Sequence, residues 1–146
     1  MRKVISLFLT ICLLTLTFTA CSSNQTTDEE LVEKSVRSFL HNFNQGSADD
    51  MLNCFSSAEK ERIGATLLSG AADAAWLAIG IALGVEEIGD TVEATSITVS
   101  VYQKDRASAY AQLKYTGSSG NYFGQVQFSL VKEKGSWYVE NYEPTE

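Results

Sequence analysis

The hydrophobic pattern of this chain changes its period near Asp90, and this change constrains the fold more than any other feature. Before Asp90, apolar residues recur every three or four positions, and after it they alternate with polar residues. The first spacing is typical of helices and the second of half-buried strands. We therefore expect helices followed by an antiparallel sheet, which is an α+β fold.

The helical part carries clear start and stop signals. Thr27 and Glu30 have the spacing of a capping box, and Gly46 suits the left-handed position that ends a helix. Ser47 and Ser56 are expected to begin two further helices. The expected inward residues are Val32, Val36, Phe39, Leu40, Phe43, Met51, Leu52, Phe55, Ile63, Leu67 and Leu68.

Residues 71–85 differ from the other helical segments because Asp73 is their only charged residue. A helix that is apolar all round is typical of a buried position, so we expect it to pack against the sheet. Gly80 and Gly84 would then allow close contact. The alternative is an exposed apolar surface for a partner or for lipid, formed by Trp76, Leu77, Ile79 and Leu83.

Four strands are expected after residue 90. In the last of them Trp137 and Val139 are expected to face inward, with Tyr138, Glu140 and Tyr142 on the opposite face. The other expected inward residues are Ile97, Val99, Val101, Ala109, Ala111, Leu113, Tyr115, Gly124, Val126, Phe128 and Leu130. Turns are expected at residues 104–106, 117–121 and 134–135.

An apolar leader precedes this domain. Arg2 and Lys3 are followed by an apolar run from Val4 to Phe18. As a helix, this run would be about 22 Å long, against about 30 Å for the hydrocarbon core of a bilayer. The pattern is typical of an export signal rather than of a membrane-spanning helix, and we expect residues 1–20 to be removed.

The net charge of the chain and its few histidine and cysteine residues argue against several functions. Without the leader the chain carries nine basic and 18 acidic residues, a net charge of −9, which argues against nucleic acid and against docking of the body on an anionic membrane. His41 is the only histidine, and with Cys54 it offers no set of metal ligands. We expect a surface position for His41, a small core role for Cys54, and no catalytic constellation, metal or cofactor.

The junction Leu16-Thr17-Phe18-Thr19-Ala20-Cys21-Ser22 resembles the lipobox of bacterial lipoproteins. That resemblance implies cleavage between Ala20 and Cys21 and a diacylglyceryl group on Cys21, which removes this cysteine from disulfide chemistry. Residues 21–27 then form a polar tether that reaches at most about 25 Å. The resemblance places the protein on the extracytoplasmic face of the cell membrane. If the cell has an outer membrane, Ser22 after the cysteine resembles the pattern of lipoproteins that are sent to that membrane.

The segments Leu31–Phe43, 45–52 and 134–139 resemble the NTF2-like superfamily, in particular its DUF4878-like lipoproteins. The resemblance implies one domain, residues 28–146, with helices packed on a curved four-stranded antiparallel sheet. In that family the sheet curls into a cone around the helices and leaves a pocket at its open end.

Together these features predict a membrane-anchored, non-enzymatic module that binds a small apolar ligand or an envelope protein. Candidates for its pocket or interaction surface are Asp73, Trp76, Leu77, Tyr102, Tyr110 and Tyr115. By analogy with NTF2-like isomerases and cyclases, the first alternative is a small enzyme with Asp73 or His41 as its base. The second is a structural or immunity-like interaction lipoprotein.

Overall fold

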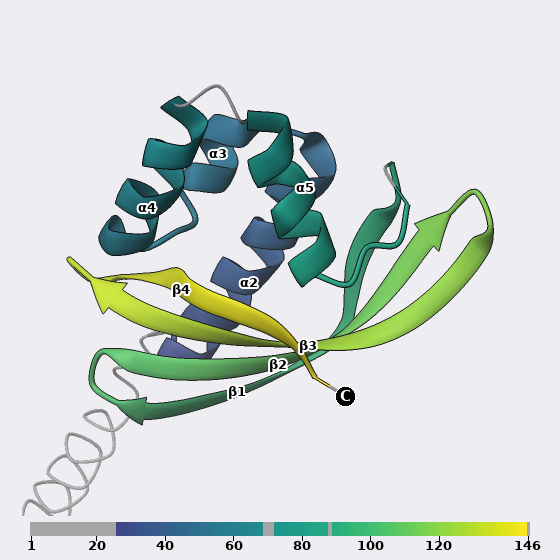
Figure 1. The fold of residues 1–146 in the computed structure, drawn as a ribbon. Helices are drawn as coiled ribbons and strands as arrows, with labels where there is room; N and C mark the ends of the chain where they lie inside the picture. Colours follow the sequence, from purple (N-terminus) through teal and green to yellow (C-terminus); the bar gives the residue numbers. More distant parts are fainter. Residues whose placement is uncertain (1–25, 69–71, 88, 146) are drawn as a thin grey trace, which may run out of the picture.

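The computed structural model describes residues 26–68, 72–87 and 89–145, and in these residues four helices precede four strands (Figure 1). The helices are α2 (Asp28–Gln45), α3 (Ala48–Leu52), α4 (Ser57–Leu68) and α5 (Ala72–Ala82). The strands are β1 (Thr91–Gln103), β2 (Arg106–Gly117), β3 (Gly120–Glu133) and β4 (Ser136–Thr145). None of the helices in the described part of the chain is long and apolar enough to cross a membrane.

Helix α2 begins and ends at the residues that the sequence predicts. Thr27 Oγ1 accepts a hydrogen bond from the Glu30 N–H at 3.2 Å, and Glu30 Oε2 accepts one from the Thr27 N–H at 3.1 Å. Gly46 ends the helix with a φ of 68°. These caps satisfy backbone groups that have no partner within the helix. The predicted stripe is confirmed, because the buried residues are Val32, Val36, Phe39, Leu40 and Phe43.

The next two helices also start at their predicted caps. The Ser47 side chain accepts a hydrogen bond from the Asp50 N–H, and the Ser56 hydroxyl accepts one from the Glu59 N–H. Phe55 lies beyond the end of α3, where it forms a bridge with Val139 of β4. This bridge connects the helical half of the chain to the last strand.

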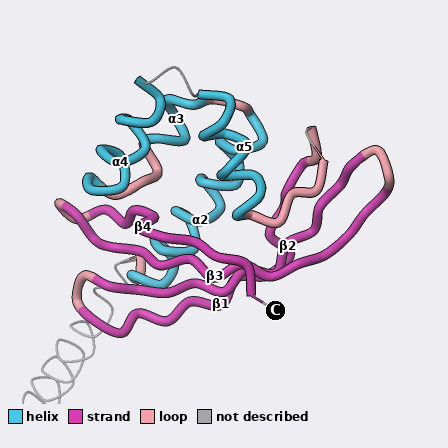
Figure 2. Tube along the Cα trace, viewed as in Figure 1, coloured by secondary structure: helices cyan, strands magenta, loops and turns pink. Residues whose placement is uncertain are grey.

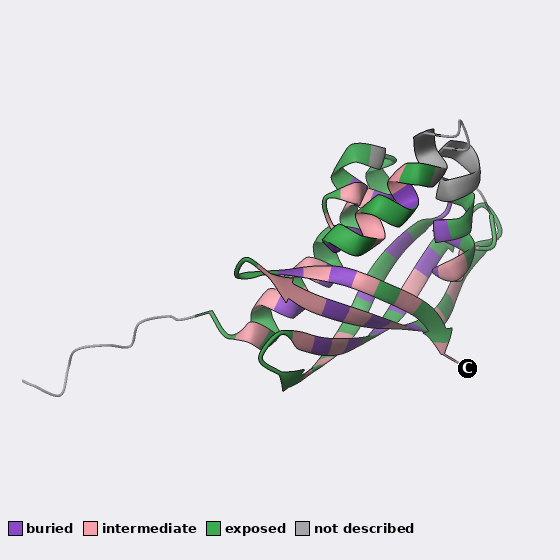
Figure 3. Ribbon diagram, turned by 60° about the vertical axis from the view of Figure 1, so that its left-hand side comes forward, coloured by how far each residue is buried: buried purple, intermediate pink, exposed green. Residues whose placement is uncertain are grey.

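The strands form one antiparallel meander in the order β1-β2-β3-β4, and the helices lie on one face of it (Figure 2). Buried and exposed residues alternate along the strands (Figure 3). At the turn between β3 and β4, Lys134 and Gly135 have φ values of 51° and 88°. Two positive φ values match the twist of the flanking strands, and they favour glycine at the second position.

Two irregularities in register change which side chains face the helices. In β1 the pairing shifts between Ala94 and Ser96, so that Val92 and Ala94 face inward before it and Ile97 after it. In β4 the pairing shifts at Glu140, opposite the step from Ser129 to Leu130. An extra residue on one strand reverses the alternation beyond it.

The irregularity in β4 overturns one prediction. Tyr142 was expected on the outer face with Tyr138, but it faces the helices and joins a cluster of aromatic rings. The Phe39 ring lies 5.2 Å from the ring of Phe55, 5.6 Å from that of Phe128 and 5.3 Å from that of Tyr142. These four rings form part of the core between α2 and the sheet.

Candidate functional site

A groove lies at the edge of this core, where α4, α5 and β4 meet. It encloses about 250 Å³. Its apolar wall includes Ile63 of α4 and Ile79 of α5, each only 7% exposed, together with Ala78 and Ala82. Its polar residues are Glu59, Arg62, Asn141 and Tyr142. The groove therefore has a mixed lining, with four apolar and four polar residues.

The charged residues of the groove neutralise each other. Arg62 Nε lies 2.8 Å from Glu59 Oε2, and a second nitrogen of the same guanidinium reaches Oε1. The hydrogen bond with Glu59 raises the pKa of Arg62 further above its ordinary value. Burial raises the pKa of Tyr142 to about 12, so its hydroxyl stays neutral at physiological pH. The polar residues of the groove offer neutral hydrogen-bonding groups and one compensated ion pair.

Helix α5, which lines part of the groove, also carries two large apolar side chains that are exposed. Leu77 is 49% exposed and Ile81 is 63% exposed, one helical turn apart. Ile79 and Leu83 lie in the core, which contradicts the expected exposed set. The exposure of Leu77 and Ile81 contradicts the expectation that this helix is buried all round. The side of α5 that packs inward carries Gly80, where a Cβ would lie 3.6 Å from the Phe43 ring.

The structure does not bring the sequence candidates into one site. Tyr115 is buried, and its hydroxyl donates a hydrogen bond to the Leu83 carbonyl. Tyr102 and Tyr110 are 58% and 49% exposed on the outer face of the sheet, so they do not line the interior of the cone. Leu77 does not line the groove, although the next residue in the chain, Ala78, does.

The remaining predicted residues lie outside the described part of the chain. These are the side chains of Asp73 and Trp76, together with Ala20, Cys21 and the rest of the leader and tether. Of the groove residues, Ile63 and Ile79 were visible in the sequence as apolar helix positions. Tyr142 could not be found in this way, because its direction depends on the bulge in β4.

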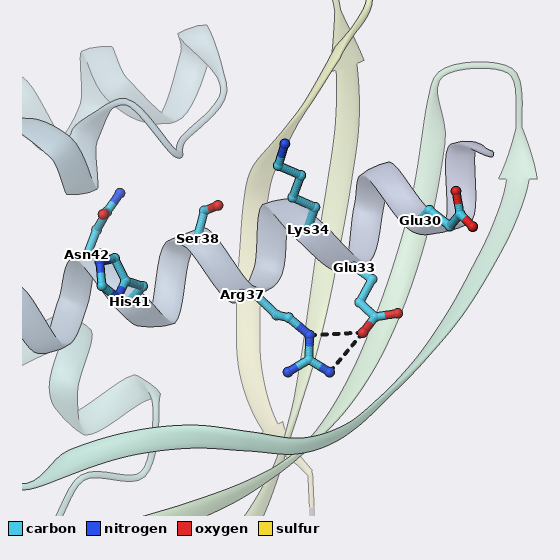
Figure 4. A pocket seen from close by; sticks show the side chains of 7 residues that line it. All are labelled: Glu30, Glu33, Lys34, Arg37, Ser38, His41 and Asn42. Carbon is cyan, nitrogen blue, oxygen red and sulfur yellow. Dashed lines mark hydrogen bonds and ion pairs between the residues drawn. The ribbon is translucent and has the colours of Figure 1, made fainter. Parts of the chain in front are cut away.

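His41 lies on the exposed outer face of α2, which carries a shallow hollow of about 540 Å³ (Figure 4). All the residues that line this hollow come from α2 itself, and Arg37 forms an ion pair with Glu33 across it. A surface supplied by one helix does not enclose a ligand. His41 is therefore a surface residue, as expected, and it does not point into the cone.

Cys54 is half-buried in the turn after α3, beside a hollow of about 280 Å³ between α2 and the β3–β4 turn. The Asn42 side-chain amide lies 3.2 Å from its sulfur. Burial raises the pKa of the thiol, which keeps it protonated and poorly nucleophilic. Among the described residues, no group of three or more metal-ligating side chains comes together.

Comparisons with known proteins support the fold. A protein with a cystatin-like fold from Nostoc punctiforme superposes with a TM-score of 0.59 and 14% identity, covering 82% of this chain and 91% of that one. An NTF2-like protein from Shewanella oneidensis superposes with a TM-score of 0.58 and 9% identity, covering 82% of this chain and 100% of that one. The fold is NTF2-like.

An NTF2-like protein from Pseudomonas putida gives a TM-score of 0.53 at 12% identity, covering 80% of this chain and 84% of that one. All three structures are described as proteins of unknown function. Searches against protein-family models and curated proteins give no match. The NTF2-like resemblance therefore fixes the architecture, and function has to be argued from the site.

Proposed function

We propose that the chain is a lipid-anchored, extracytoplasmic binding module that holds an apolar group in the groove between α4, α5 and β4. The observation that carries the proposal is that α5 both lines the groove, through Ala78, Ile79 and Ala82, and exposes the large apolar side chains of Leu77 and Ile81. Apolar surface left exposed beside a recess is typical of binding sites.

The size of the groove narrows the choice of ligand. Pockets for drug-sized molecules span about 300–1,000 Å³, and this groove is slightly smaller, at 250 Å³. It suits a short acyl chain or one or two apolar side chains of an envelope protein. The neutral Tyr142 hydroxyl and the Asn141 amide would orient a polar end of the ligand.

The anchor is the second part of the proposal, and it rests on the lipobox-like junction ending at Cys21. Two acyl chains hold a protein stably at a membrane, whereas one chain does not. The tether joins the domain at the start of α2, where Asp28 accepts hydrogen bonds from Lys132 and Trp137. A Cys21→Ala variant should therefore move from the membrane fraction to the soluble fraction.

A non-enzymatic role agrees best with the described residues. His41 faces outward on α2, and aromatic rings occupy the space between α2 and the sheet. The isomerase or cyclase alternative would need Asp73 as its base. The structural or immunity-like alternative would use the same apolar surface on α5.

The groove is tested by titrating the full-length protein in lipid nanodiscs, labelled with ¹³C at isoleucine methyl groups, with hexanoic acid and with indole. Binding in the groove should shift the methyl signals of Ile63 and Ile79 and leave that of Ile97, on β1, unchanged. Ala78→Phe should fill the groove and abolish the shifts. Ala65→Phe, on an exposed part of α4, is the matched control. Equal shifts at all three isoleucines would contradict the proposal.

A further inference from the structure

The outer face of the sheet, turned away from the helices, carries an ordered array of polar side chains. Three neighbouring rows cross all four strands in register, and the middle row is Thr98, Tyr110, Gln127 and Glu143. The rows on either side contain only serine, threonine, glutamine and asparagine. They are Ser96, Gln112, Gln125 and Thr145 on one side, and Ser100, Ser108, Ser129 and Asn141 on the other. We refer to these twelve positions as the outer-face lattice.

The lattice is depleted of charge. About a quarter to a third of the residues on an ordinary protein surface are charged, which would give three or four charges in twelve positions. The lattice has one, Glu143, although the whole chain carries a net charge of −7. Its composition differs from the rest of the surface and favours an uncharged ligand.

The hydrogen-bonding groups of the lattice are unused. Among the described residues, none of the twelve side chains forms a hydrogen bond with another protein group, and the Thr145 hydroxyl is buried without a partner. Hydroxyl and amide side chains each donate and accept hydrogen bonds. Tyr110 lies in the middle row, and 49% of its surface is exposed. The lattice therefore combines an exposed ring with free donors and acceptors on neighbouring strands.

We propose that the outer-face lattice binds an uncharged glycan chain, with Tyr110 as the ring on which a sugar stacks. A sugar presents an apolar C–H face that fits an aromatic ring, and hydroxyl groups that pair with amides and hydroxyls. Strand faces bind oligosaccharides in other small β folds. The lattice and the groove share only Asn141, at the end of one row. The glycan proposal therefore concerns a different face of the sheet, goes beyond the proposed function and does not depend on it.

Other occupants fit the lattice less well. An anionic polymer would need lysine or arginine, and the lattice has neither. The core of a protein interface is typically built from aromatic, methionine and arginine anchors, whereas Tyr110 is the single aromatic residue of the lattice.

The experiment measures retention of full-length protein on insoluble chitin and cellulose, in a detergent without a sugar headgroup, with chitohexaose as the soluble competitor. Tyr110→Ala should weaken retention by about tenfold. Phe123→Ala is the matched control, because Phe123 is 71% exposed on the same sheet face but pairs with Lys114, outside the lattice. It should change retention by less than about twofold.

The proposal is supported if chitohexaose competes and Tyr110→Ala alone weakens retention. It is overturned if neither polysaccharide retains the protein, or if both variants weaken retention equally, which would indicate nonspecific adsorption by exposed rings. Sedimentation equilibrium gives an independent readout. A dimer that Tyr110→Ala dissociates, without any retention on polysaccharide, would assign the lattice to self-association and reject the glycan. Thermal unfolding of each variant checks that it is folded.

Discussion

The hydroxyl of Tyr122 lies 2.9 Å from Oδ2 of Asp90 and joins the β2–β3 hairpin to the segment after α5. The same hydroxyl accepts a hydrogen bond from the Glu86 N–H at 2.8 Å, and the Tyr122 ring stacks on that of Tyr115 at 4.5 Å. Asp90 is 8% exposed and also accepts a hydrogen bond from the Glu87 N–H. One tyrosine therefore completes the hydrogen bonding of a buried carboxylate and of a loop backbone.

Tyr122→Phe should lower the free energy of unfolding by about 1–2 kcal/mol, because it leaves the Glu86 N–H and the Asp90 carboxylate each with one partner fewer. Urea denaturation followed by circular dichroism measures the change. Tyr102→Phe, at a position that is 58% exposed, should change it by less than about 0.5 kcal/mol. Equal effects of the two variants would show that the Tyr122 hydroxyl does not stabilise the fold.

Gly117→Ala should destabilise the same region by about 1–3 kcal/mol, since overpacking forces neighbouring groups to move. A Cβ at this position would lie 1.9 Å from Oδ1 of Asp90. Gly64 provides the opposite case, because it lies within α4 and a Cβ there would meet nothing within 4 Å. Gly64→Ala should stabilise the protein by up to about 1 kcal/mol. Thermal unfolding of both variants checks the contrast in sign.

Phe39→Ala should lower the free energy of unfolding by about 3–5 kcal/mol, as expected when a buried aromatic side chain is removed. Phe39 is fully buried and contacts the rings of Phe55, Phe128 and Tyr142. Phe123→Ala removes the same side chain from an exposed position and should have an effect below about 0.5 kcal/mol. Guanidinium denaturation measures both, and a small loss for Phe39→Ala would mean that the ring cluster is loosely packed.

Protonation of the Asp28 carboxylate at acid pH should lower the free energy of unfolding. Its hydrogen bonds from Lys132 and then Trp137 hold the pKa of this carboxyl below its ordinary value of 3.8. A carboxyl with a lowered folded-state pKa stabilises the fold above the unfolded-state pKa, and this contribution is lost as pH falls through the folded-state pKa.

The Asp28→Asn variant isolates this contribution from those of other carboxyls. It should be less stable than the wild type at neutral pH, and the difference should shrink as pH falls below about 4. Urea midpoints measured across that range give the two curves. Parallel curves at every pH would show that the Asp28 carboxylate gains no stability from its partners.

Local signals in the sequence were sufficient for the elements and most of the core. The capping box of Thr27 and Glu30 and the glycine at position 46 predicted both ends of α2, because caps involve only neighbouring residues. The alternation in β2 predicted that Ala109, Ala111, Leu113 and Tyr115 are buried. By the same alternation Tyr110 faces outward, and it was grouped with Tyr115 only through analogy with the fold family.

The sequence by itself determined the helices, the strands and the turn at Lys134 and Gly135, since each depends on backbone preferences and on spacing within a few residues. Only the tertiary structure decided the direction of Tyr142, because a bulge at Glu140 arises from pairing with β3. It also decided which side of α5 is covered: Ile79 is buried and Ile81 exposed. A helix that is apolar all round has no sequence signal for its buried side. The elements that pack against α5 therefore decide which of its residues are covered and which line the groove or stay exposed.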